Sequence, residues 1–213
     1  REYGWICSLL SDFPLRHHPD DHFEVVAPTP IIVLEGDNYN PHRVRQYLRR
    51  LTAEGNAVGL LHIGDEFGHA PLDIYDEAAF VYRNYWRPAV RRYAQCRYLP
   101  LGVNCPLDAF SPGTPFTERA HRWSFAGQAK GPREAMIDAV SQRSDGYLRV
   151  NENFNSGLPK DAYAQLLSNT QVVLCPRGFR AAESYRVYEA LEAGAIPLVE
   201  DDGGRGLWRE HAS

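Results

Sequence analysis

The sequence predicts an α/β protein made of two Rossmann-like domains, and three observations lead to that prediction. Short apolar runs alternate with helical segments along the chain, which is typical of parallel βαβ units. A Pro/Gly cluster from Ser111 to Pro115 interrupts this alternation and has no apolar periodicity. Of the 213 residues, 44% are hydrophobic and 23% are charged, as in globular proteins. We therefore place an N-terminal domain at residues 1–115 and a C-terminal domain at residues 116–213.

The N-terminal half is expected to contain a parallel strand–helix–strand unit followed by two further strands. Its first segment is an apolar, strand-like run from Trp5 to Leu10, which a polar loop follows. The next two apolar runs are separated by enough chain for one crossover helix, which favours parallel pairing. The expected elements are a strand at Ile31–Leu34, a helix at about Pro41–Glu54, a strand within Ala57–Ile63, and short strands at Phe80–Tyr82 and Tyr98–Leu101.

The C-terminal half shows the same alternation. Its first strand, Trp123–Gly127, ends in glycine, and Pro132 follows where the first turn of a helix tolerates proline. The helix at Arg133–Gln142 has one apolar face, formed by Met136, Ile137 and Val140. The remaining expected elements are a strand at Tyr147–Val150, a helix at Lys160–Ser168, a strand at Gln171–Cys175, a helix at Ser184–Ala193 and a strand at Ala195–Val199.

Charge and hydropathy exclude two classes of partner. The formal net charge of −4 lacks the basic footprint of a nucleic-acid binder. No apolar run approaches the roughly 20 residues that a membrane span needs. We therefore expect no nucleic-acid partner and no membrane span within this chain, and the sequence leaves homo- and hetero-oligomers open.

The cysteines and histidines form no ordered metal-ligand motif. No C-x-x-C pair occurs among Cys7, Cys96, Cys105 and Cys175, which disfavours a zinc knuckle or a redox motif. Cys7 and Cys175 are expected to be buried thiols, whereas Cys96 and Cys105 could form a disulfide in an oxidising compartment. The histidines and aspartates of the segment His17–His22 are expected to be a solvated loop, so we expect no metal site. The location stays undetermined, although the absence of an Asn-x-Ser/Thr sequon slightly favours the cytoplasm over the Golgi lumen.

The stretch from Val172 to Asp201 carries the strongest chemical signal. A buried strand ends at Cys175, a Pro-Arg-Gly turn follows, and a helix begins near Ser184. Ligands of open parallel sheets bind beyond the carboxyl ends of the strands, where the N–H groups and partial positive charge of a helix N-terminus suit a diphosphate. The same helix is expected to turn Val187, Ala190 and Leu191 inward and to end at Gly194.

Charged side chains flank this helix start. Arg177 and Arg186 are placed to add charge-assisted contacts to a diphosphate, and Glu189 is placed to accept the two hydroxyls of a ribose. The alternative interpretation is that these residues form surface ion pairs on an ordinary helix, because charged pairs at such spacing are common.

The segment resembles the donor-sugar motif of the exostosin family of glycosyltransferases. The resemblance rests on Pro176-Arg177-Gly178, on Ser184, Arg186 and Glu189-Ala190-Leu191, on Gly194 and Ile196-Pro197, and upstream on Phe125-Ala126-Gly127-Gln128 with Arg133. It extends from about Arg122 to Val199 and, more loosely, over His62–Trp86. It implies a GT-B architecture, a nucleotide-sugar donor in the second domain, with a UDP-sugar expected, and inversion at the anomeric carbon without a tightly bound metal or other cofactor.

The resemblance assigns roles to individual residues. Arg177, Ser184 and Arg186 would hold the diphosphate, Glu189 the ribose, and Gly127 and Gln128 would line the donor site. One of the two arginines would also stabilise the charge that develops on the leaving group. The sequence lacks an Asp-x-Asp metal motif, and Ala181 stands eight positions before Glu189 where retaining GT-B enzymes often have a second glutamate, which agrees with an inverting reaction.

An inverting transfer also needs a base for the acceptor hydroxyl of a glycan or glycoconjugate. That base is expected from the first domain, across the cleft. Asp65 and Glu66, just after a buried strand, are the candidates, with His62 and His69 behind them, although each carboxylate is equally suited to capping a loop. Nearby aromatic residues either stack on an acceptor sugar or pack in the core: Tyr82, Tyr85, Trp86 and Tyr93.

Two other functions remain open from the sequence. One is a catalytically silent subunit that serves a partner glycosyltransferase, and the other is a nucleotide-sugar epimerase, which needs no acceptor. The segment after Val199, Glu200–Ser213, is too short for the last strands and the returning helix of a GT-B protein. We therefore expect the C-terminal domain to be incomplete.

Overall fold

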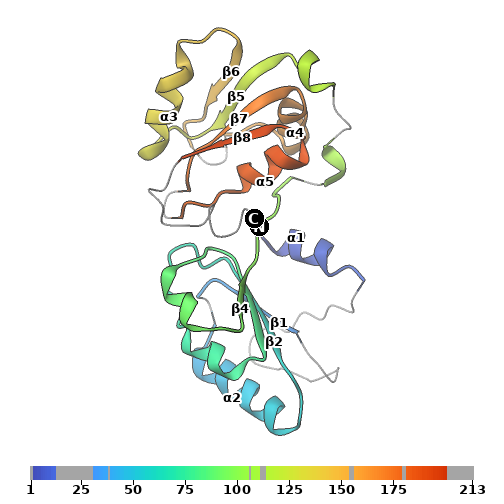
Figure 1. Ribbon diagram of the computed structural model, residues 1–213, viewed down its shortest axis with the longest axis vertical. Helices are drawn as coiled ribbons and strands as arrows, with labels where there is room; N and C mark the ends of the chain where they lie inside the picture. The colour runs from blue at the N-terminus through green and yellow to red at the C-terminus, as the bar shows by residue number, and fades with distance from the viewer. Residues whose placement is uncertain are drawn as a thin grey trace. The chain divides into compact units, whose positions relative to one another are not determined.

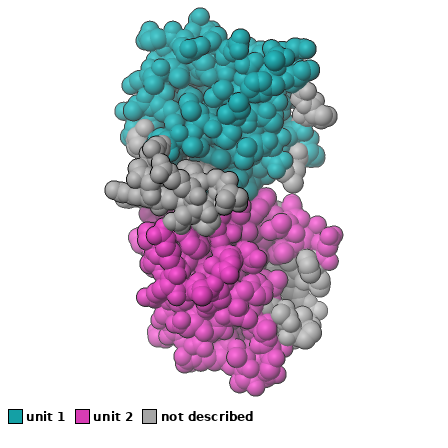
Figure 2. Space-filling model, viewed as in Figure 1, with its two compact units in different colours: residues 1, 101–213 teal, residues 2–100 magenta. Residues whose placement is uncertain are grey.

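The computed structural model describes residues 2–12, 31–37, 39–105, 107–110, 114–153, 156–178 and 181–200. The chain divides into two compact units, an N-terminal unit, Glu2–Pro100, and a C-terminal unit that includes Leu101–Ser213, coloured magenta and teal in Figure 2. Each unit contains a four-stranded parallel sheet with helices packed on it (Figure 1). This confirms the predicted α/β class with two Rossmann-like halves.

The sheet of the N-terminal unit has the strand order β1-β2-β3-β4, and every neighbouring pair is parallel. Its strands are β1 (Ile31–Glu35), β2 (Gly59–Ile63), β3 (Phe80–Arg83) and β4 (Cys96–Tyr98). Its helices are α1 (Glu2–Leu9), α2 (Pro41–Ala53) and the 3-10 turns η1 (Asp73–Glu77) and η2 (Pro88–Arg92).

The strand β2 is buried on both faces because a helix packs against each of them. On one face Leu60 belongs to the core that α2 closes with Leu48 and Leu51. On the other face Leu61 and Ile63 pack with Ile6 of α1. The start of α2 is fixed by Asn40, whose Oδ1 accepts hydrogen bonds from the backbone N–H groups of the second and third helical residues, at 3.1 and 3.2 Å.

Two element predictions for this unit were wrong. The apolar run that begins at Trp5 lies in the helix α1, not in a strand, because a short apolar run fits either structure and here one face of a helix buries Ile6. The last strand of this unit, β4, spans Cys96–Tyr98, so it ends where the predicted strand Tyr98–Leu101 was to begin. Pro100 follows, and a proline has no N–H group to extend the ladder.

The sheet of the C-terminal unit has the strand order β6-β5-β7-β8, again with every pair parallel. Its strands are β5 (His121–Gly127), β6 (Gly146–Val150), β7 (Thr170–Cys175) and β8 (Ile196–Val199). Its helices are α3 (Pro132–Ser141), α4 (Lys160–Ser168), α5 (Tyr185–Glu192) and the 3-10 turns η3 (Leu107–Ala109) and η4 (Phe116–Glu118).

The predicted apolar faces of the C-terminal helices are confirmed for α3 and corrected for α5. Ile137 of α3 is buried, with Met136 and Val140 packed beside it. In α5 the buried residues are Val187, Glu189 and Ala190, so Val187 and Ala190 face inward as predicted. Leu191, which was also predicted to face inward, is 56% exposed. Gly194 has φ +63° directly after the C-cap, as expected for a helix end.

The stretch that opens the C-terminal unit is tied to it by buried carboxylates. The N–H of Leu101 donates to Glu183 Oε1 at 2.9 Å, and the N–H groups of Asn104 and Cys105 donate to Glu189 Oε1 at 3.1 and 3.3 Å. Of the Pro/Gly cluster, Thr114 and Pro115 are described, whereas residues 111–113 lie outside the described residues, as do the segment His17–His22 and the residues after Glu200.

Candidate functional site

The start of α5 lies at the carboxyl end of β7 and has an unusual cap. Ser184 is the N-cap residue, with extended backbone angles, but its side chain makes no capping hydrogen bond. Its Oγ is buried and has no partner among the described residues. An N-cap hydroxyl ordinarily accepts a hydrogen bond from one of the first N–H groups of the helix, and it stabilises the helix by about 1 kcal/mol. The hydroxyl and these N–H groups are therefore not satisfied by one another.

Arg186, in the first turn of α5, reaches across to the carboxyl end of β5. Its Nη2 donates to the carbonyl oxygen of Ala126 at 3.2 Å, and its Cζ lies 5.0 Å from the centre of the Phe125 ring. A Cβ atom at Gly127 would be 2.5 Å from Nη2, so only glycine leaves room for the guanidinium there. The Nε of Arg186 is buried without a partner among the described residues. A positive charge with unused donors is thus fixed at this edge of the sheet.

The loops after β5 and β7 are joined by a second arginine, Arg133 of α3. Its Nε donates to the carbonyl oxygen of Arg177 at 3.2 Å, and its Nη1 lies 3.5 Å from the carbonyl oxygen of Gln128. The side chain of Gln128 donates to the carbonyl oxygen of Glu152 at 3.4 Å. Arg177 itself is exposed, and its backbone N–H donates to Glu200 Oε1 at 3.4 Å. The structure therefore gathers the predicted residues Gly127, Gln128, Arg177, Ser184 and Arg186 at one edge of this sheet.

Glu189, predicted to hold a ribose, is only 4% exposed and accepts the two backbone hydrogen bonds from Asn104 and Cys105. Burial raises the pKa of its carboxyl group, although those N–H donors and the charge of Arg186 oppose the shift. Glu183 is also a buried carboxylate that accepts a backbone hydrogen bond. Its Oε1 accepts from the Leu101 N–H and, at 2.7 Å, from the Tyr188 hydroxyl. Both carboxylates hold the first loop of the C-terminal unit, a role that sequence reasoning missed because their partners are more than 80 residues away.

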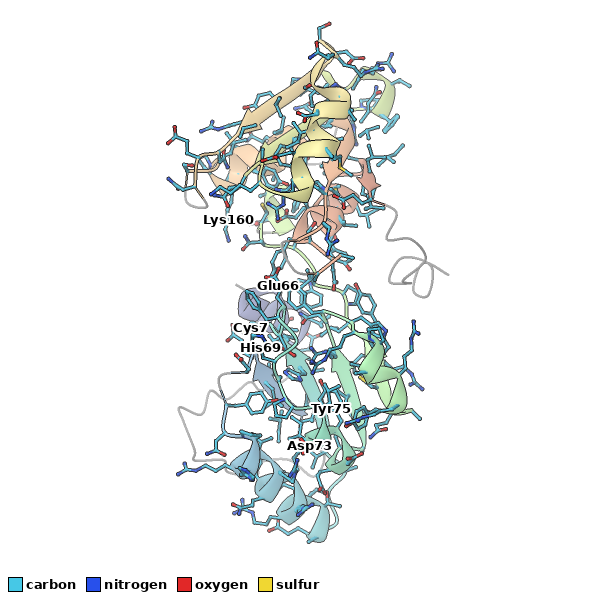
Figure 3. All side chains as sticks on the ribbon, turned by 90° about the vertical axis from the view of Figure 1, so that its left-hand side faces the viewer. Cys7, Glu66, His69, Asp73, Tyr75 and Lys160 are labelled. Atoms are coloured by element: carbon cyan, nitrogen blue, oxygen red, sulfur yellow. The ribbon has the colours of Figure 1, made fainter. Side chains whose placement is uncertain are left out.

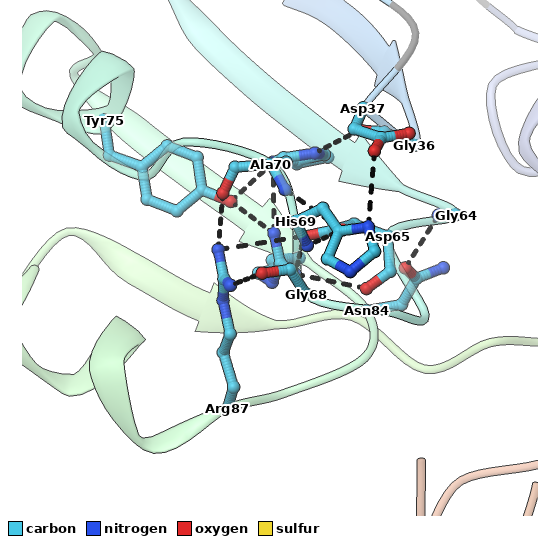
Figure 4. Close-up of polar contacts among 12 residues, drawn as sticks. Gly36, Asp37, Gly64, Asp65, Gly68, His69, Ala70, Tyr75, Asn84 and Arg87 are labelled. Carbon is cyan, nitrogen blue, oxygen red and sulfur yellow. Dashed lines mark hydrogen bonds and ion pairs between the residues drawn. The ribbon is translucent and has the colours of Figure 1, made fainter. Parts of the chain in front are cut away.

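In the N-terminal unit, Asp65 follows β2, and its side chain bonds to the backbone at the other end of the loop from Gly64 to Ala70. Its Oδ1 accepts hydrogen bonds from the N–H groups of His69 and Ala70 at 2.8 and 3.2 Å. Its Oδ2 is 2.6 Å from Nη2 of Arg83. The same oxygen is 3.7 Å from Nη2 of Arg87, which Figure 4 shows beside the loop. Burial alone would raise the pKa of Asp65, but the hydrogen bond and charge of Arg83 outweigh it, so the pKa is lowered.

Arg83 links Asp65 to a buried aromatic pair. Its Nη1 donates to the hydroxyl of Tyr75 at 2.9 Å and lies 3.2 Å from Nδ1 of His62, which is itself 2.6 Å from that hydroxyl. His62 Nε2 lies 3.0 Å from the carbonyl oxygen of Gly36, which can only accept, so Nε2 carries the proton. Burial, aided by the charge of Arg83, lowers the pKa of His62 to about 4. His62 is thus a neutral, structural residue at pH 7.

A third group clamps the same loop from outside. Arg87 donates from Nη1 to the carbonyl oxygen of Gly68 and from Nη2 to that of Ala70, the latter at 2.6 Å. The N–H of Gly64, at the other end of the loop, donates to Asn84 Oδ1 at 3.1 Å. Sequence reasoning missed Arg83, although an arginine at the end of an otherwise apolar strand, as in Phe80–Arg83, is a signal of a buried charge partner. It interpreted Arg87 as part of a solvated basic face, whereas its guanidinium bonds to the loop.

The other residues considered for the acceptor differ in their exposure and contacts. Glu66 is partly exposed, and its carboxylate makes no ion pair or hydrogen bond within the part of the chain that the structure describes. His69 is exposed, and its Nδ1 lies 3.7 Å from Asp37 Oδ2. Figure 3 shows Glu66 and His69 near the same end of this unit. Of the aromatic residues considered, Tyr85 and Tyr93 are buried, Trp86 packs against the core, and Tyr82 is 41% exposed.

The described ranges contain no cluster of metal ligands, no disulfide and no membrane-spanning helix. No group of three or more His, Cys, Asp or Glu side chains there could hold a metal ion. The four cysteines are free thiols, with Cys96, Cys105 and Cys175 buried and Cys7 partly exposed. No helix in these ranges is long and apolar enough to cross a membrane.

Comparison with known families connects this geometry to a chemistry. Residues 121–210 match the family model of the RXYLT1 C-terminal domain. The match includes β5, β7 and α5, and with them every residue predicted to bind the donor. It supports a relationship to exostosin-like and xylosyltransferase proteins, and with it a glycosyltransferase-like function. A search of the curated proteins finds no match to the chain.

Proposed function

We propose that the chain is an inverting glycosyltransferase of GT-B type that moves a sugar from a UDP-sugar to a hydroxyl group of a glycan or glycoconjugate. One observation carries the proposal: the guanidinium of Arg186 is fixed beside Gly127 at the end of β5, next to the N-terminus of α5, where the N-cap residue Ser184 makes no side-chain capping hydrogen bond. A fixed positive charge beside a helix N-terminus is a site for a diphosphate. The match over residues 121–210 supports the same chemistry.

The diphosphate is assigned to Arg177, Ser184 and Arg186. The Nε of Arg186 and the Oγ of Ser184 are buried polar atoms that lack partners among the described residues, and phosphate oxygens would satisfy both. Gly127 and Gln128 line the site from the loop after β5. We assign the ribose to Glu189. Its carboxylate accepts hydrogen bonds from the N–H groups of Asn104 and Cys105, so the loop that contains these two residues has to shift for the ribose to bind.

The transfer itself needs a base, a nucleophile and a leaving group. The acceptor hydroxyl gives its proton to a carboxylate, its oxygen bonds to the anomeric carbon, and the bond from that carbon to the diphosphate breaks with the electron pair going to UDP. Arg186 or Arg177 stabilises the negative charge that develops on the diphosphate. This electrostatic contribution is commonly the largest in such reactions.

Of the two candidate bases we assign the role to Glu66. Asp65 has both oxygens engaged and a lowered pKa, which make it a weak base. Glu66 is adjacent, is partly exposed, and takes no part in that network. We expect Glu66→Gln to lower kcat about 100-fold with donor affinity unchanged, as is typical for loss of a general base. The exposed Glu118 provides a control, and Glu118→Gln should leave kcat unchanged.

The donor site is tested by binding. UDP, GDP and CMP are compared by their effect on the melting temperature of the whole chain, since a nucleotide that binds the folded state raises it. We expect UDP to raise it, and Arg186→Ala to weaken UDP binding by about tenfold or more, because charge-assisted hydrogen bonds are lost. Arg186→Lys retains the charge and guards against a simple folding defect.

The control for the binding test is Arg143→Ala, which removes an exposed arginine of the same unit that pairs with Asp145. The donor site would be wrong if Arg186→Ala and Arg143→Ala bound UDP equally well. UDP binding without transfer to any acceptor would favour the silent subunit, and conversion of the donor sugar without an acceptor would favour the epimerase.

A further inference from the structure

The loop from Gly64 to Ala70 is rigidly built and yet presents apolar surface to solvent. Its backbone is held by Asp65 from inside and by Arg87 and Asn84 from the segment after β3. Phe67, at its tip, is nevertheless 61% exposed. A large aromatic side chain held outward by a fixed backbone is poorly explained by packing, and exposed aromatic residues commonly mark binding sites.

One polar ring contacts Phe67, and two carboxylates belong to the same group of residues. The imidazole of His69 is stacked with Phe67, with ring centres 5.7 Å apart and an angle of 27° between the rings. Asp37, after β1, lies 3.7 Å from His69 Nδ1, and Glu66 precedes Phe67 in the chain. These residues follow β1 and β2 at the carboxyl edge of the sheet, where ligands of parallel α/β folds bind.

An aromatic face beside carboxylates and an imidazole has the chemistry to bind a pyranose. The C–H groups on one side of a pyranose ring form an apolar face that stacks on an aromatic ring, while its hydroxyls donate to carboxylates. Two carboxylates, Asp37 and Glu66, repel an anionic sugar, so the surface favours an uncharged one. The guanidinium groups of Arg83 and Arg87 are already bonded to the loop and to Asp65.

We propose that Phe67, His69 and Asp37 form a subsite for an uncharged pyranose. The subsite rests on the proposed function in one respect, since the sugar would then be part of the acceptor whose hydroxyl Glu66 deprotonates. Phe67 and His69 provide the stacking surface, and Asp37 accepts hydroxyl hydrogen bonds while it orients His69.

The subsite is tested by ligand-observed NMR on the whole chain, without any turnover. The probes are methyl β-D-xylopyranoside, methyl β-D-galactopyranoside and methyl β-D-glucuronide. We expect saturation transfer to the ring protons of at least one neutral glycoside and none to the glucuronide. Phe67→Ala should weaken that binding about tenfold, since stacking on an aromatic ring is lost, and Phe67→Trp should retain it.

The matched control is Phe116→Ala, which removes a phenylalanine that is 41% exposed in the C-terminal unit. The proposal would be overturned if neither neutral glycoside bound, if the glucuronide bound equally well, or if both alanine variants bound like the parent chain. UDP affinity, measured on the same samples, should be unchanged in Phe67→Ala. Failure of the donor site and failure of this subsite are thereby separate results, because each has its own ligand.

Discussion

Two loops of this protein each follow a central strand of a four-stranded parallel sheet, and they differ in how fully their polar groups are bonded within the fold. After β2, Asp65, Arg83 and Arg87 bond to one another and to the loop that they surround. After β7, the Ser184 Oγ has no partner among the described residues, and Arg186 donates one side-chain hydrogen bond, to the carbonyl oxygen of Ala126. A buried Nε without a partner in the described part of the chain is common to Arg83, Arg87 and Arg186, so the two loops differ in how many bonds their other polar atoms make. Polar groups with many bonds within the fold stabilise it, whereas the sparsely bonded groups at the start of α5 are candidates for binding a ligand, because a buried polar atom without a partner costs free energy.

The largest effect expected from this contrast is on stability. Arg83→Met removes one side of a buried ion pair and leaves the Asp65 carboxylate buried without its partner. We expect it to lower the free energy of unfolding of the N-terminal unit by about 3–5 kcal/mol, as measured by urea denaturation. Arg143→Ala, which breaks an exposed pair, should have no measurable effect. Equal stability of the two variants would contradict a structural role for the network.

The same network makes the stability of the N-terminal unit depend on pH. His62 has a pKa of about 4 in the folded state, below its ordinary value of 6.5, so the unfolded chain binds a proton that the folded chain does not. Stability is therefore complete above pH 6.5 and falls as the pH drops from there toward 4. Between pH 7 and pH 5 the loss should be about 2 kcal/mol.

The lowered pKa of Asp65 acts at lower pH and in the same direction. Its contribution is present above the ordinary pKa of an aspartate and is lost as the pH falls through the lower folded value. Urea denaturation at a series of pH values measures both effects. His62→Gln should remove the part of the pH dependence between pH 7 and pH 5, and a slope unchanged by that substitution would show that another group is responsible.

A smaller effect, on UDP affinity, is expected from a substitution at Gly127, at the end of β5 in the C-terminal unit. In Gly127→Ala the new Cβ would meet Arg186 Nη2 at 2.5 Å, which displaces the end of a flexible side chain. We expect UDP affinity to fall about tenfold, because Arg186 leaves its place at the end of β5 and its charge-assisted hydrogen bonds to the diphosphate are lost. Isothermal titration calorimetry measures the affinity. Gly131→Ala is a matched control. Gly127 and Gly131 both have a positive φ, +156° and +61°, so both substitutions strain the backbone, but nothing lies within 4 Å of a Cβ at Gly131.

The smallest expected effect comes from Ser184→Ala, which tests whether the Ser184 hydroxyl stabilises the fold or binds a ligand. The Ser184 hydroxyl has no partner among the described residues, so its removal should leave the melting temperature unchanged or slightly higher. The same substitution should weaken UDP binding about fivefold, since one hydrogen bond to the diphosphate is lost. A lower melting temperature with unchanged UDP affinity would show that the hydroxyl serves the fold.

The sequence predicted most strands and helices because their apolar periodicity is local. It predicted α4 at its observed bounds, and it misassigned the helix α1, whose short apolar run suits two structures. In the C-terminal unit, the position of Arg177, Ser184 and Arg186 after a strand and the family resemblance of Gly127 and Gln128 named residues that the structure places at the ends of β5 and β7, two neighbouring strands of one sheet. It did not anticipate the clamp on Asp65, because Arg83 and Arg87 are about twenty positions away and the sheet brings them there.

The clamp on the loop from Gly64 to Ala70 separates the residues that shape the loop from those that it displays. The shape depends on Asp65, Arg83 and Arg87, whereas the side chains of Phe67 and His69 are exposed and stack on each other. Over evolution, or in the laboratory, the displayed side chains can therefore be exchanged while the backbone that carries them stays the same. A library restricted to Glu66, Phe67 and His69 would alter which molecule the loop recognises on an unchanged scaffold.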